Sequence, residues 1–441
     1  MKKRLLPYLA AILGAPCALA GDIIVDPNLQ GDAVTIREGL LLAQPGDTVI
    51  VYPGAYRESL DISKGVWIVP QQEGTVTVEG VVRIQNLPID QQILLSGLEF
   101  SGSGDGWISI RNCDGVVHLD RSTFRSGTRD FPAASLFNAR RVILTHTDLY
   151  GYDGSPYSYG GGSYGSPAIN LVSSRATAWG GRFEGGNGSH DNGCSSGAER
   201  GHPGAYLYIS QLFAAGTVFV GGEGGDDFCI FASSLGADGG DAIYSAGNSL
   251  TVLQGVTLQP GGAGEGHGGM ASPGQPLTGT GSTRFLGGNP ETHQADRFAF
   301  DGGTVGLTIH GNPGATPRMF LLTRGTPFLF DFYTPPGSLA LGQSLPAGSF
   351  IGGAGTIGGS GSVTASVPIP ALPSETIQAV FLASASSNHA RSLFGAPMPV
   401  LGVNRATVGR DCDGNGLVDL FELATGSAVD ANLDGRPDNC P

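Results

Sequence analysis

A short unit that recurs along the chain constrains its fold more than any other feature. Each copy has a large apolar residue followed by small ones, as in Thr-Phe-Arg-Ser-Gly at 123–127. The apolar positions, spaced 24 to 39 residues apart, are Phe100, Phe124, Leu149, Phe183, Phe219, Leu258 and Phe285. A strand that cannot bury its apolar face alone stacks on the next copy. The repeat therefore predicts an all-β solenoid of parallel strands about 4.8 Å apart, with the phenylalanines from Phe100 to Phe219 aligned in its interior.

Glycine is concentrated where the repeat is longest. Of the 73 glycines, 36 lie between residues 151 and 290, where three consecutive copies carry insertions. Because the insertion falls at the same place in each copy, we expect these loops to project from one edge of the solenoid. Glycine at such positions permits positive φ and close stacking of backbones.

The segment 22–70 predicts how the solenoid begins. Apolar residues at Ile36, Leu40 and Ala43 have helical spacing, and strands are expected at 48–52, 59–62 and 66–69, with turns at 45–47 and 53–56. The N-terminal cap of right-handed parallel β-helix proteins of the pectin-lyase-like superfamily resembles residues 35–69 of this chain, TIREGLLLAQPGDTVIVYPGAYRESLDISKGVWIV. The resemblance implies that the short helix covers the open end of the first coil. It says little about activity, because that superfamily contains lyases, hydrolases, epimerases and non-catalytic proteins.

Residues 1–20 have the features of an export signal. Three basic residues at 2–4 precede an apolar stretch from Leu5 to Ala15 that is too short to span a bilayer. The small residues Ala18 and Ala20 predict cleavage after Ala20, and a retained membrane anchor is the alternative. We therefore expect a secreted or cell-surface protein. The formal net charge of −14 becomes −17 without the signal, which argues against nucleic acid or an anionic membrane as partner.

Five cysteines remain after the signal, and an odd number in an exported protein leaves one unpaired. Cys194 could pair with Cys229 if the glycine-rich loops stack, and Cys412 with Cys440. Cys113 is then expected to be a buried free thiol.

The chain divides into three regions after the signal. Residues 21–295 are assigned to the solenoid with its cap and glycine-rich loops. Short alternating strands separated by Pro and Gly turns predict a β-sandwich over 296–408. We expect this region to be a spacer or a cover for the last coil. A carbohydrate-binding role is the alternative, although the region contains no Trp and only one Tyr, Tyr333. Residues 409–441 are assigned to a third region, which contains the motif described next.

The strongest chemical motif is a pattern of oxygen ligands with the spacing that Ca²⁺ requires. It occurs first at Asp411, Asp413, Asn415, Leu417, Asp419 and Glu422 and again at Asp430, Asn432, Asp434 and Asp438. The pair resembles EF-hand and dockerin-like calcium repeats, which implies that this segment binds Ca²⁺. The second loop lacks a glutamate at its twelfth position. Segment 411–441 has seven acidic residues and one basic residue, so we expect it to fold only with Ca²⁺. A solvated acidic tail is the alternative.

Acidic and histidine residues collect in the glycine-rich loops. The run Gly-Asp-Asp-Phe-Cys-Ile at 225–230, with His267 downstream, resembles part of the polygalacturonase pattern, in which paired aspartates hydrolyse a glycosidic bond. An extra Phe228 interrupts that pattern. A lyase would instead need Ca²⁺ and an arginine base, for which Arg182 and Arg125 lie on strand ends that we expect to be equivalent. The candidate catalytic residues are thus Asp226, Asp227, His267 and Arg182, with turn-forming and solubilising roles as the alternative.

Two functions follow from these observations. The first is a non-catalytic extracellular β-helix protein that binds or scaffolds cell-surface components through its loop edge, stabilised at its end by Ca²⁺. The second is a polysaccharide lyase or glycoside hydrolase that acts on an acidic glycan. Close approach of Asp226, Asp227 and His267 in a cleft would favour the enzyme.

Overall fold

The computed structural model describes the chain in segments that cover most of residues 22–287 and the strands beyond them. The described residues are 22–28, 31–72, 74–101, 107–127, 131–154, 165–190, 197–227, 235–287, 292–295, 298–300, 304–314, 316–323, 330–331, 340–341, 350–353, 356–360, 362–368, 377–386, 393–394, 398–403, 428–429, 431 and 438. The predicted export signal at 1–20 lies outside them. In the part described, the protein is nearly all β, with the single helix α2 (Ile36–Leu42).

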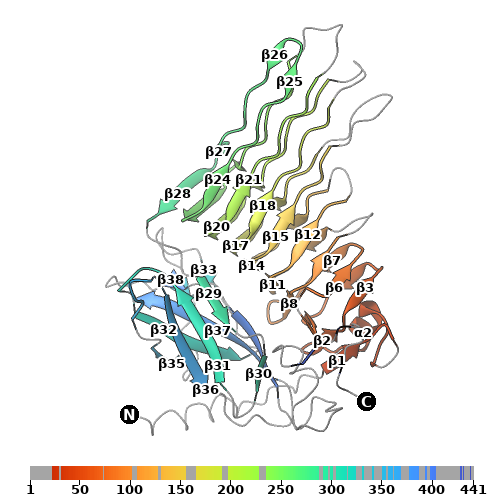
Figure 1. Cartoon of the computed structure of the whole chain (residues 1–441), viewed down its shortest axis with the longest axis vertical. Helices are drawn as coiled ribbons and strands as arrows, with labels where there is room; N and C mark the ends of the chain where they lie inside the picture. The colour runs from red at the N-terminus through yellow and green to blue at the C-terminus, as the bar shows by residue number, and fades with distance from the viewer. Residues whose placement is uncertain are drawn as a thin grey trace.

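Three long parallel sheets run side by side through residues 22–286 (Figure 1). Sheet A has ten strands in the order β1 (Asp22–Val25), β2 (Thr48–Val51), β5 (Trp67–Pro70), β8 (Gln92–Ser96), β11 (Val116–Asp120), β14 (Arg141–Thr145), β17 (Arg175–Trp179), β20 (Gln211–Ala215), β23 (Leu250–Gln254) and β28 (Ser282–Leu286). Sheet B has eight, namely β3 (Gly54–Tyr56), β6 (Val76–Val78), β9 (Glu99–Phe100), β12 (Thr123–Arg125), β15 (Asp148–Tyr150), β18 (Arg182–Glu184), β21 (Val218–Val220) and β24 (Thr257–Gln259). Sheet C also has eight, namely β4 (Leu60–Ile62), β7 (Val82–Gln85), β10 (Ile108–Arg111), β13 (Ala134–Phe137), β16 (Ile169–Val172), β19 (Ala205–Tyr208), β22 (Ile243–Ala246) and β27 (Leu277–Thr278).

The chain visits the three sheets in turn, so each turn of chain, or coil, adds one strand to each sheet. Strand β11, for example, pairs in parallel with β8 of the coil before and with β14 of the coil after. This arrangement is consistent with a β-helix solenoid.

The interior of the coils is apolar and aligned in register. Phe100 pairs with Phe124, followed by Leu149, Phe183 and Phe219, and all five side chains are fully buried. The rings of Phe100 and Phe124 stack with centroids 4.5 Å apart, whereas Phe183 and Phe219 meet edge to face at 5.2 Å. The predicted phenylalanine ladder is therefore confirmed.

Two parts of the sequence prediction are wrong. Phe285 lies on β28 in sheet A, where it pairs with Leu253, and its side chain is 65% exposed. It therefore does not continue the ladder of sheet B. The expected turn at 53–56 contains a strand, β3, because Tyr56 packs inward and pairs with Val78 of the next coil.

The first coil begins as the cap motif predicts. The Thr35 hydroxyl accepts the Glu38 N–H and caps helix α2 at its N-terminus. Ile36 and Leu40 point into the apolar core. This end of the solenoid is therefore covered.

Left-handed turns join sheet C to sheet A. Asn86, Asn112 and Asn138 occupy successive turns with φ between 52° and 57°, and the Asn138 side-chain N–H₂ donates to Asn112 Oδ1 at 3.2 Å. Asparagine tolerates this conformation better than most residues. Cys113, which follows one of these turns, is a buried free thiol, as predicted.

Beyond residue 287 the described strands pair mostly antiparallel. One sheet has the order β29 (Thr292–Ala295), β31 (Thr304–His310), β36 (Ser362–Pro368), and a second has β30 (Phe298–Phe300), β39 (Met398–Val403), β37 (Ile377–Ser386), β32 (Thr316–Thr323), β35 (Phe350–Gly353), with β38 (Leu393–Phe394) paired to β37. Two short strands, β33 (Phe330–Asp331) and β34 (Ala340–Leu341), pair with each other. Because β29 belongs to this antiparallel part, the change in architecture falls between β28 and β29.

Candidate functional site

The glycine-rich insertions form a two-layered extension that rises from the solenoid between sheets B and C (Figure 1). In one layer the chain leaves sheet B, and in the other it returns to sheet C. The outgoing segments are 151–154, 185–190, 221–227 and 260–265, and the returning segments are 165–168, 197–204, 235–242 and 271–276. We call these segments the glycine extension. The prediction that the insertions project from one edge is confirmed.

Backbone hydrogen bonds in the glycine extension repeat every three residues. In segment 221–227 the N–H groups of Gly221 and Gly224 donate to the next coil, at Gln259 O (2.8 Å) and Gly262 O (2.9 Å). The N–H groups of Gly222 and Gly225 instead donate across to the returning layer, at His202 O (2.8 Å) and Glu199 O (2.9 Å). A three-residue period is that of the extended polyproline II helix, so the extension is a bundle of such helices tied together in two directions.

Glycine is required where these segments cross closely. A Cβ on Gly186 would lie 1.7 Å from the Tyr152 carbonyl oxygen, one on Gly222 would lie 2.0 Å from Gly186 O, and one on Gly261 would lie 1.8 Å from Gly222 O. All three contacts are with backbone, which cannot move aside without breaking the bundle. The glycine content of 151–290 therefore reflects packing.

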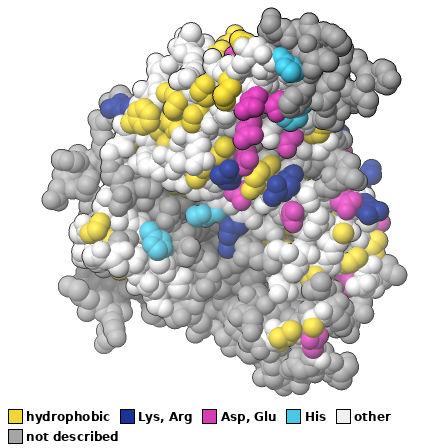
Figure 2. Space-filling model, turned by 45° about the horizontal axis from the view of Figure 1, so that its top comes forward, with side chains coloured by type: hydrophobic (Ala, Val, Ile, Leu, Met, Phe, Trp, Pro, Cys, Tyr) yellow, Lys and Arg dark blue, Asp and Glu magenta, His cyan; other side chains and the backbone are white. Residues whose placement is uncertain are grey.

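Polar side chains on the outer faces complete the hydrogen bonds of the bundle. Each accepts the outward-facing backbone N–H of the following coil. The pairs are Asp153 Oδ1 with Asn187 N (2.8 Å), Asn187 Oδ1 with Glu223 N (2.7 Å), His190 Nδ1 with Asp226 N (2.9 Å), Asp226 Oδ1 with Glu265 N (2.7 Å), Asp238 Oδ1 with Ser272 N (2.9 Å) and Asp241 Oδ1 with Gln275 N (2.8 Å). Acidic side chains also gather in a line on one face of the molecule (Figure 2).

The structure brings three of the four candidate catalytic residues into one region. Asp226 Oδ2 lies 3.2 Å from His190 Nδ1. Asp227 is buried and its N–H donates to Glu265 O at 2.7 Å. His267 is exposed between β25 (Glu265–Gly266) and β26 (Gly269–Met270), next to the bridge that joins Asp227 to Gly266. The two aspartates therefore occupy different positions of the bundle: Asp226 faces outward and Asp227 faces inward.

Arg182 lies far from these residues. It pairs in register with Val218, eight residues before Asp226, and an extended chain rising ~3.1 Å per residue puts about 25 Å between them. Its Nε donates to Glu184 Oε2 at 2.6 Å. Arg125 is not on an equivalent position, since it pairs with Tyr150 and, one coil further, with Glu184. Its guanidinium lies over the Tyr150 ring, 3.9 Å from the centroid.

A buried polar cluster on sheet A has no counterpart in the sequence prediction. His118 Nε2 lies 2.8 Å from Thr145 Oγ1, whose hydroxyl donates to Asp120 Oδ1 at 2.6 Å. Ser96 Oγ and Arg121 Nε donate to Asp120 Oδ2 at 2.7 and 2.9 Å. His118 and Asp120 lie on the outward side of β11, where a strand pattern alone predicts exposure.

Burial sets the ionisation of this cluster. Loss of hydration lowers the pKa of His118 to about 4, although Asp120 opposes the shift. Burial alone would raise the pKa of Asp120, but the adjacent Arg121 and the hydrogen bonds from Thr145 and Ser96 outweigh it and hold that pKa below its usual value. At neutral pH the cluster therefore contains a neutral imidazole and a paired carboxylate.

The predicted calcium ligands, apart from Asp438, lie outside the described residues. The Ala431 N–H donates to both Asp438 carboxylate oxygens, at 3.1 and 3.2 Å, and the Asp438 N–H donates to Val429 O at 2.7 Å. These bonds bring Asp438 next to Val429 and Ala431. Among the described residues, no three His, Cys, Asp or Glu side chains converge in a way that could hold a metal ion.

Comparisons of the chain with protein-family models, with curated proteins and with solved structures find no match. Within the part of the chain that is described, no helix has the length and apolar character needed to cross a membrane.

Proposed function

We propose that this chain is an exported, right-handed β-helix protein that binds or scaffolds cell-surface components and catalyses no reaction. One observation carries the proposal. Asp226, a candidate acid or base in the sequence, accepts the Glu265 backbone N–H, and the neighbouring His190 accepts that of Asp226. Polar side chains that recur as acceptors between successive coils have a structural role in the bundle, which explains their presence without catalysis.

The positions of the candidates support the same proposal. A glycosidase needs two carboxyl groups facing each other across the scissile bond, whereas Asp226 occupies an outward position and Asp227 a buried one. A lyase needs a free arginine beside the acids, whereas Arg182 is paired with Glu184 and stands about 25 Å away along the extended chain.

The test is an absorbance assay for unsaturated uronate, together with a reducing-sugar assay, on acidic polysaccharides with and without Ca²⁺. We expect no product in any combination. Asp226→Asn should leave this result unchanged. Asp226→Ala, which removes the acceptor of the Glu265 N–H, should lower the resistance of the extension to protease. Product formation by the wild-type chain, lost in Asp226→Asn or Arg182→Gln, would show that the protein is an enzyme.

The end of the chain is proposed to be a calcium segment. Support comes from the Asp438 carboxylate, which accepts the N–H of Ala431, the residue after the first predicted ligand of the second motif. The oxygens of Asp411, Asp413, Asn415, Leu417, Asp419 and Glu422 would hold one ion, and those of Asp430, Asn432, Asp434 and Asp438 a second.

Chelation tests this assignment. We expect EDTA to lower the midpoint of thermal unfolding of segment 411–441 and to expose it to protease, because its acidic residues repel one another without metal. In a Glu422→Gln variant the effect of EDTA should shrink, while a Glu79→Gln variant, in the solenoid, should respond as wild type does. No response of the wild-type chain to EDTA would contradict the calcium assignment.

The antiparallel sheets beyond residue 287 are proposed to pack as a β-sandwich that serves as a spacer. Support comes from the two-sheet pairing and from the burial of Leu307 and Ile309 on β31. Thr257, Gln259 and Phe285 are exposed, so the expectation that this region covers the last coil is not met at these residues.

A further inference from the structure

The outward face of sheet C differs from the other two. The outward side chains of sheet A, such as Trp67, Trp179 and Phe213, are buried. On sheet B, Arg125 is stacked on Tyr150 and Arg182 is paired with Glu184. The outward side chains of sheet C, apart from the buried Ser109, are in contrast partly or fully exposed.

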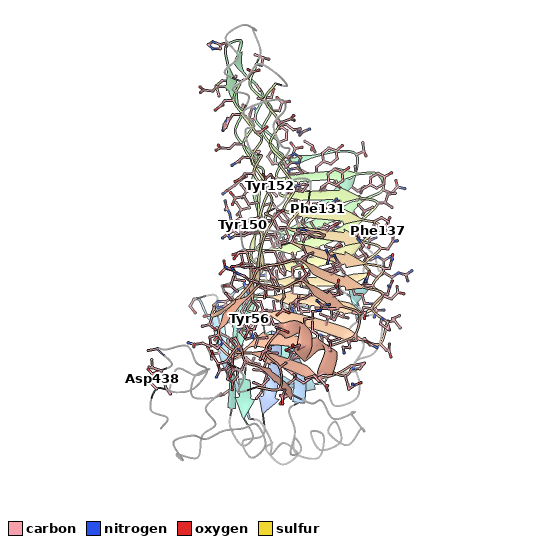
Figure 3. The ribbon with its side chains drawn as sticks, turned by 90° about the vertical axis from the view of Figure 1, so that its right-hand side faces the viewer. Tyr56, Phe131, Phe137, Tyr150, Tyr152 and Asp438 are labelled. Atoms are coloured by element: carbon pink, nitrogen blue, oxygen red, sulfur yellow. The ribbon has the colours of Figure 1, made fainter. Side chains whose placement is uncertain are left out.

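Aromatic side chains lie on this face in three of the four coils that contain β13, β16, β19 and β22. Phe137, Val172 and Tyr208 form one column, and Phe137 and Tyr208 are 45% and 44% exposed. In the adjacent column Tyr206 stacks on Tyr244, with centroids 5.2 Å apart and planes inclined by 11°. Phe137 lies at the outer edge of the sheet, away from Tyr150 and Tyr152 at the base of the glycine extension (Figure 3). We call Phe137, Val172, Tyr206, Tyr208 and Tyr244 the strip; all five are partly or fully exposed, and an exposed apolar patch is a candidate interaction site.

Backbone strain beside the strip is a second, independent observation. Ile209 follows Tyr208 in the turn that Asn86, Asn112 and Asn138 occupy in earlier coils and Gly247 occupies in the next. Its φ is 52°, which is unfavourable for a β-branched residue, and its side chain is 51% exposed. A residue that is strained and gains no burial within the chain points to a contact outside it.

Shape and charge together indicate the partner. Four partly exposed rings offer about 300 Å² of aromatic surface, well below the roughly 800 Å² per partner of a stable protein interface. The strip is narrow, and its strands follow one another every ~4.8 Å along the solenoid axis. This geometry suits an extended ligand made of successive sugar rings. None of its outward residues on β13, β16, β19 and β22 is charged; they are Ser135, Phe137, Asn170, Val172, Tyr206, Tyr208, Tyr244 and Ala246. An uncharged face on a protein of net charge −14 disfavours an anionic ligand.

We propose that this strip binds an uncharged polysaccharide that lies along the solenoid axis, with sugar rings against Phe137 and Tyr208 and hydroxyl groups toward Ser135. The assignment rests on the proposed binding function and names its partner.

Affinity electrophoresis of the full chain in gels containing hydroxyethylcellulose, a neutral β-glucan, tests the proposal. We expect retardation of the wild type and a dissociation constant about three- to tenfold higher for Phe137→Ala or Tyr208→Ala. Phe285→Ala removes a more exposed ring from sheet A and should bind as wild type does. Ile209→Asn should raise the thermal midpoint, because strain is relieved, and weaken binding.

Three results would overturn the proposal. They are the absence of retardation, retardation that is unchanged in a Phe137→Ala/Tyr208→Ala double variant, and equal or stronger retardation by polygalacturonate. Each leaves the proposed non-catalytic function standing, since that function fails only if the assays for unsaturated uronate or reducing sugar detect product.

Discussion

At the residue scale, the neutral His118 makes stability depend on pH. The unfolded chain takes up a proton near the ordinary histidine pKa of 6.5, whereas the folded chain does so only near 4. Between these values the unfolded state binds more protons, so stability falls as pH falls through this window, by about 3 kcal/mol in total. Urea unfolding at pH 7, 5.5 and 4.5 should show that the free energy of unfolding decreases with pH. In His118→Gln this dependence on pH should be weaker. An unchanged dependence in that variant would assign the effect to other groups.

The phenylalanine ladder gives a second prediction at this scale. Phe124 is fully buried between Phe100 and Leu149, so Phe124→Ala should destabilise the solenoid by about 3–5 kcal/mol. Phe285→Ala removes the same side chain from an exposed position and should cost less than about 0.5 kcal/mol. Equilibrium unfolding in denaturant measures both. A similar decrease in the free energy of unfolding in the two variants would contradict the stacked phenylalanine interior.

The same residues show what sequence can and cannot specify. The recurrence of Phe before small residues predicts the ladder from Phe100 to Phe219, because each copy must bury the same position. Arg-Phe-Leu-Gly-Gly around Phe285 has the same local pattern as Arg-Phe-Glu-Gly-Gly around Phe183, yet it lies on a different sheet, since pattern does not fix register. His118 was not predicted as a site because strand alternation places it outward, and only the folded chain shows that the outward face of sheet A is buried.

At the element scale, the glycine extension should respond to a single methyl group. Gly222→Ala would place a Cβ 2.0 Å from Gly186 O, so the outgoing segments must separate, at a cost of about 1–3 kcal/mol. Gly262→Ala is the matched control, because its Cβ would lie 4.0 Å from the Glu223 side chain. We expect limited proteolysis to cut within the extension of Gly222→Ala and to leave Gly262→Ala intact. Equal resistance of both variants would contradict the close-packed bundle.

The sequence predicts where the extension leaves the solenoid and does not predict its internal order. Insertions at one place in each repeat imply loops at one edge. A polyproline II bundle, however, has no apolar periodicity, because its glycines contribute backbone only. Its acceptors, such as Asp226 and His190, resemble catalytic residues in a sequence, and their structural role becomes evident only from the N–H groups that they bind.

At the scale of the whole molecule, the solenoid must stop at both ends without offering free edges. Helix α2 covers the first coil. In the next-to-last coil of the extension, the N–H groups of Gly221, Gly239 and Ala242 donate to the last coil, at Gln259 O (2.8 Å), Ser272 O (2.9 Å) and Gln275 O (3.0 Å). The register of Val220 with Gln259 and of Ile243 with Leu277 sets the equivalent positions of the last coil. These positions are occupied by Pro260, Pro273 and Pro276.

Proline has no N–H, so the last layer of the bundle cannot donate to a further one at these three places. Natural proteins use proline in this way to prevent an exposed strand edge from forming hydrogen bonds with another chain. A Pro260→Gly/Pro273→Gly/Pro276→Gly variant should therefore associate as its concentration rises, measured by light scattering after size exclusion. Pro203→Gly changes an outward position of an inner coil and should behave as wild type does. If the triple variant shows the same concentration dependence as wild type, the prolines do not terminate the bundle.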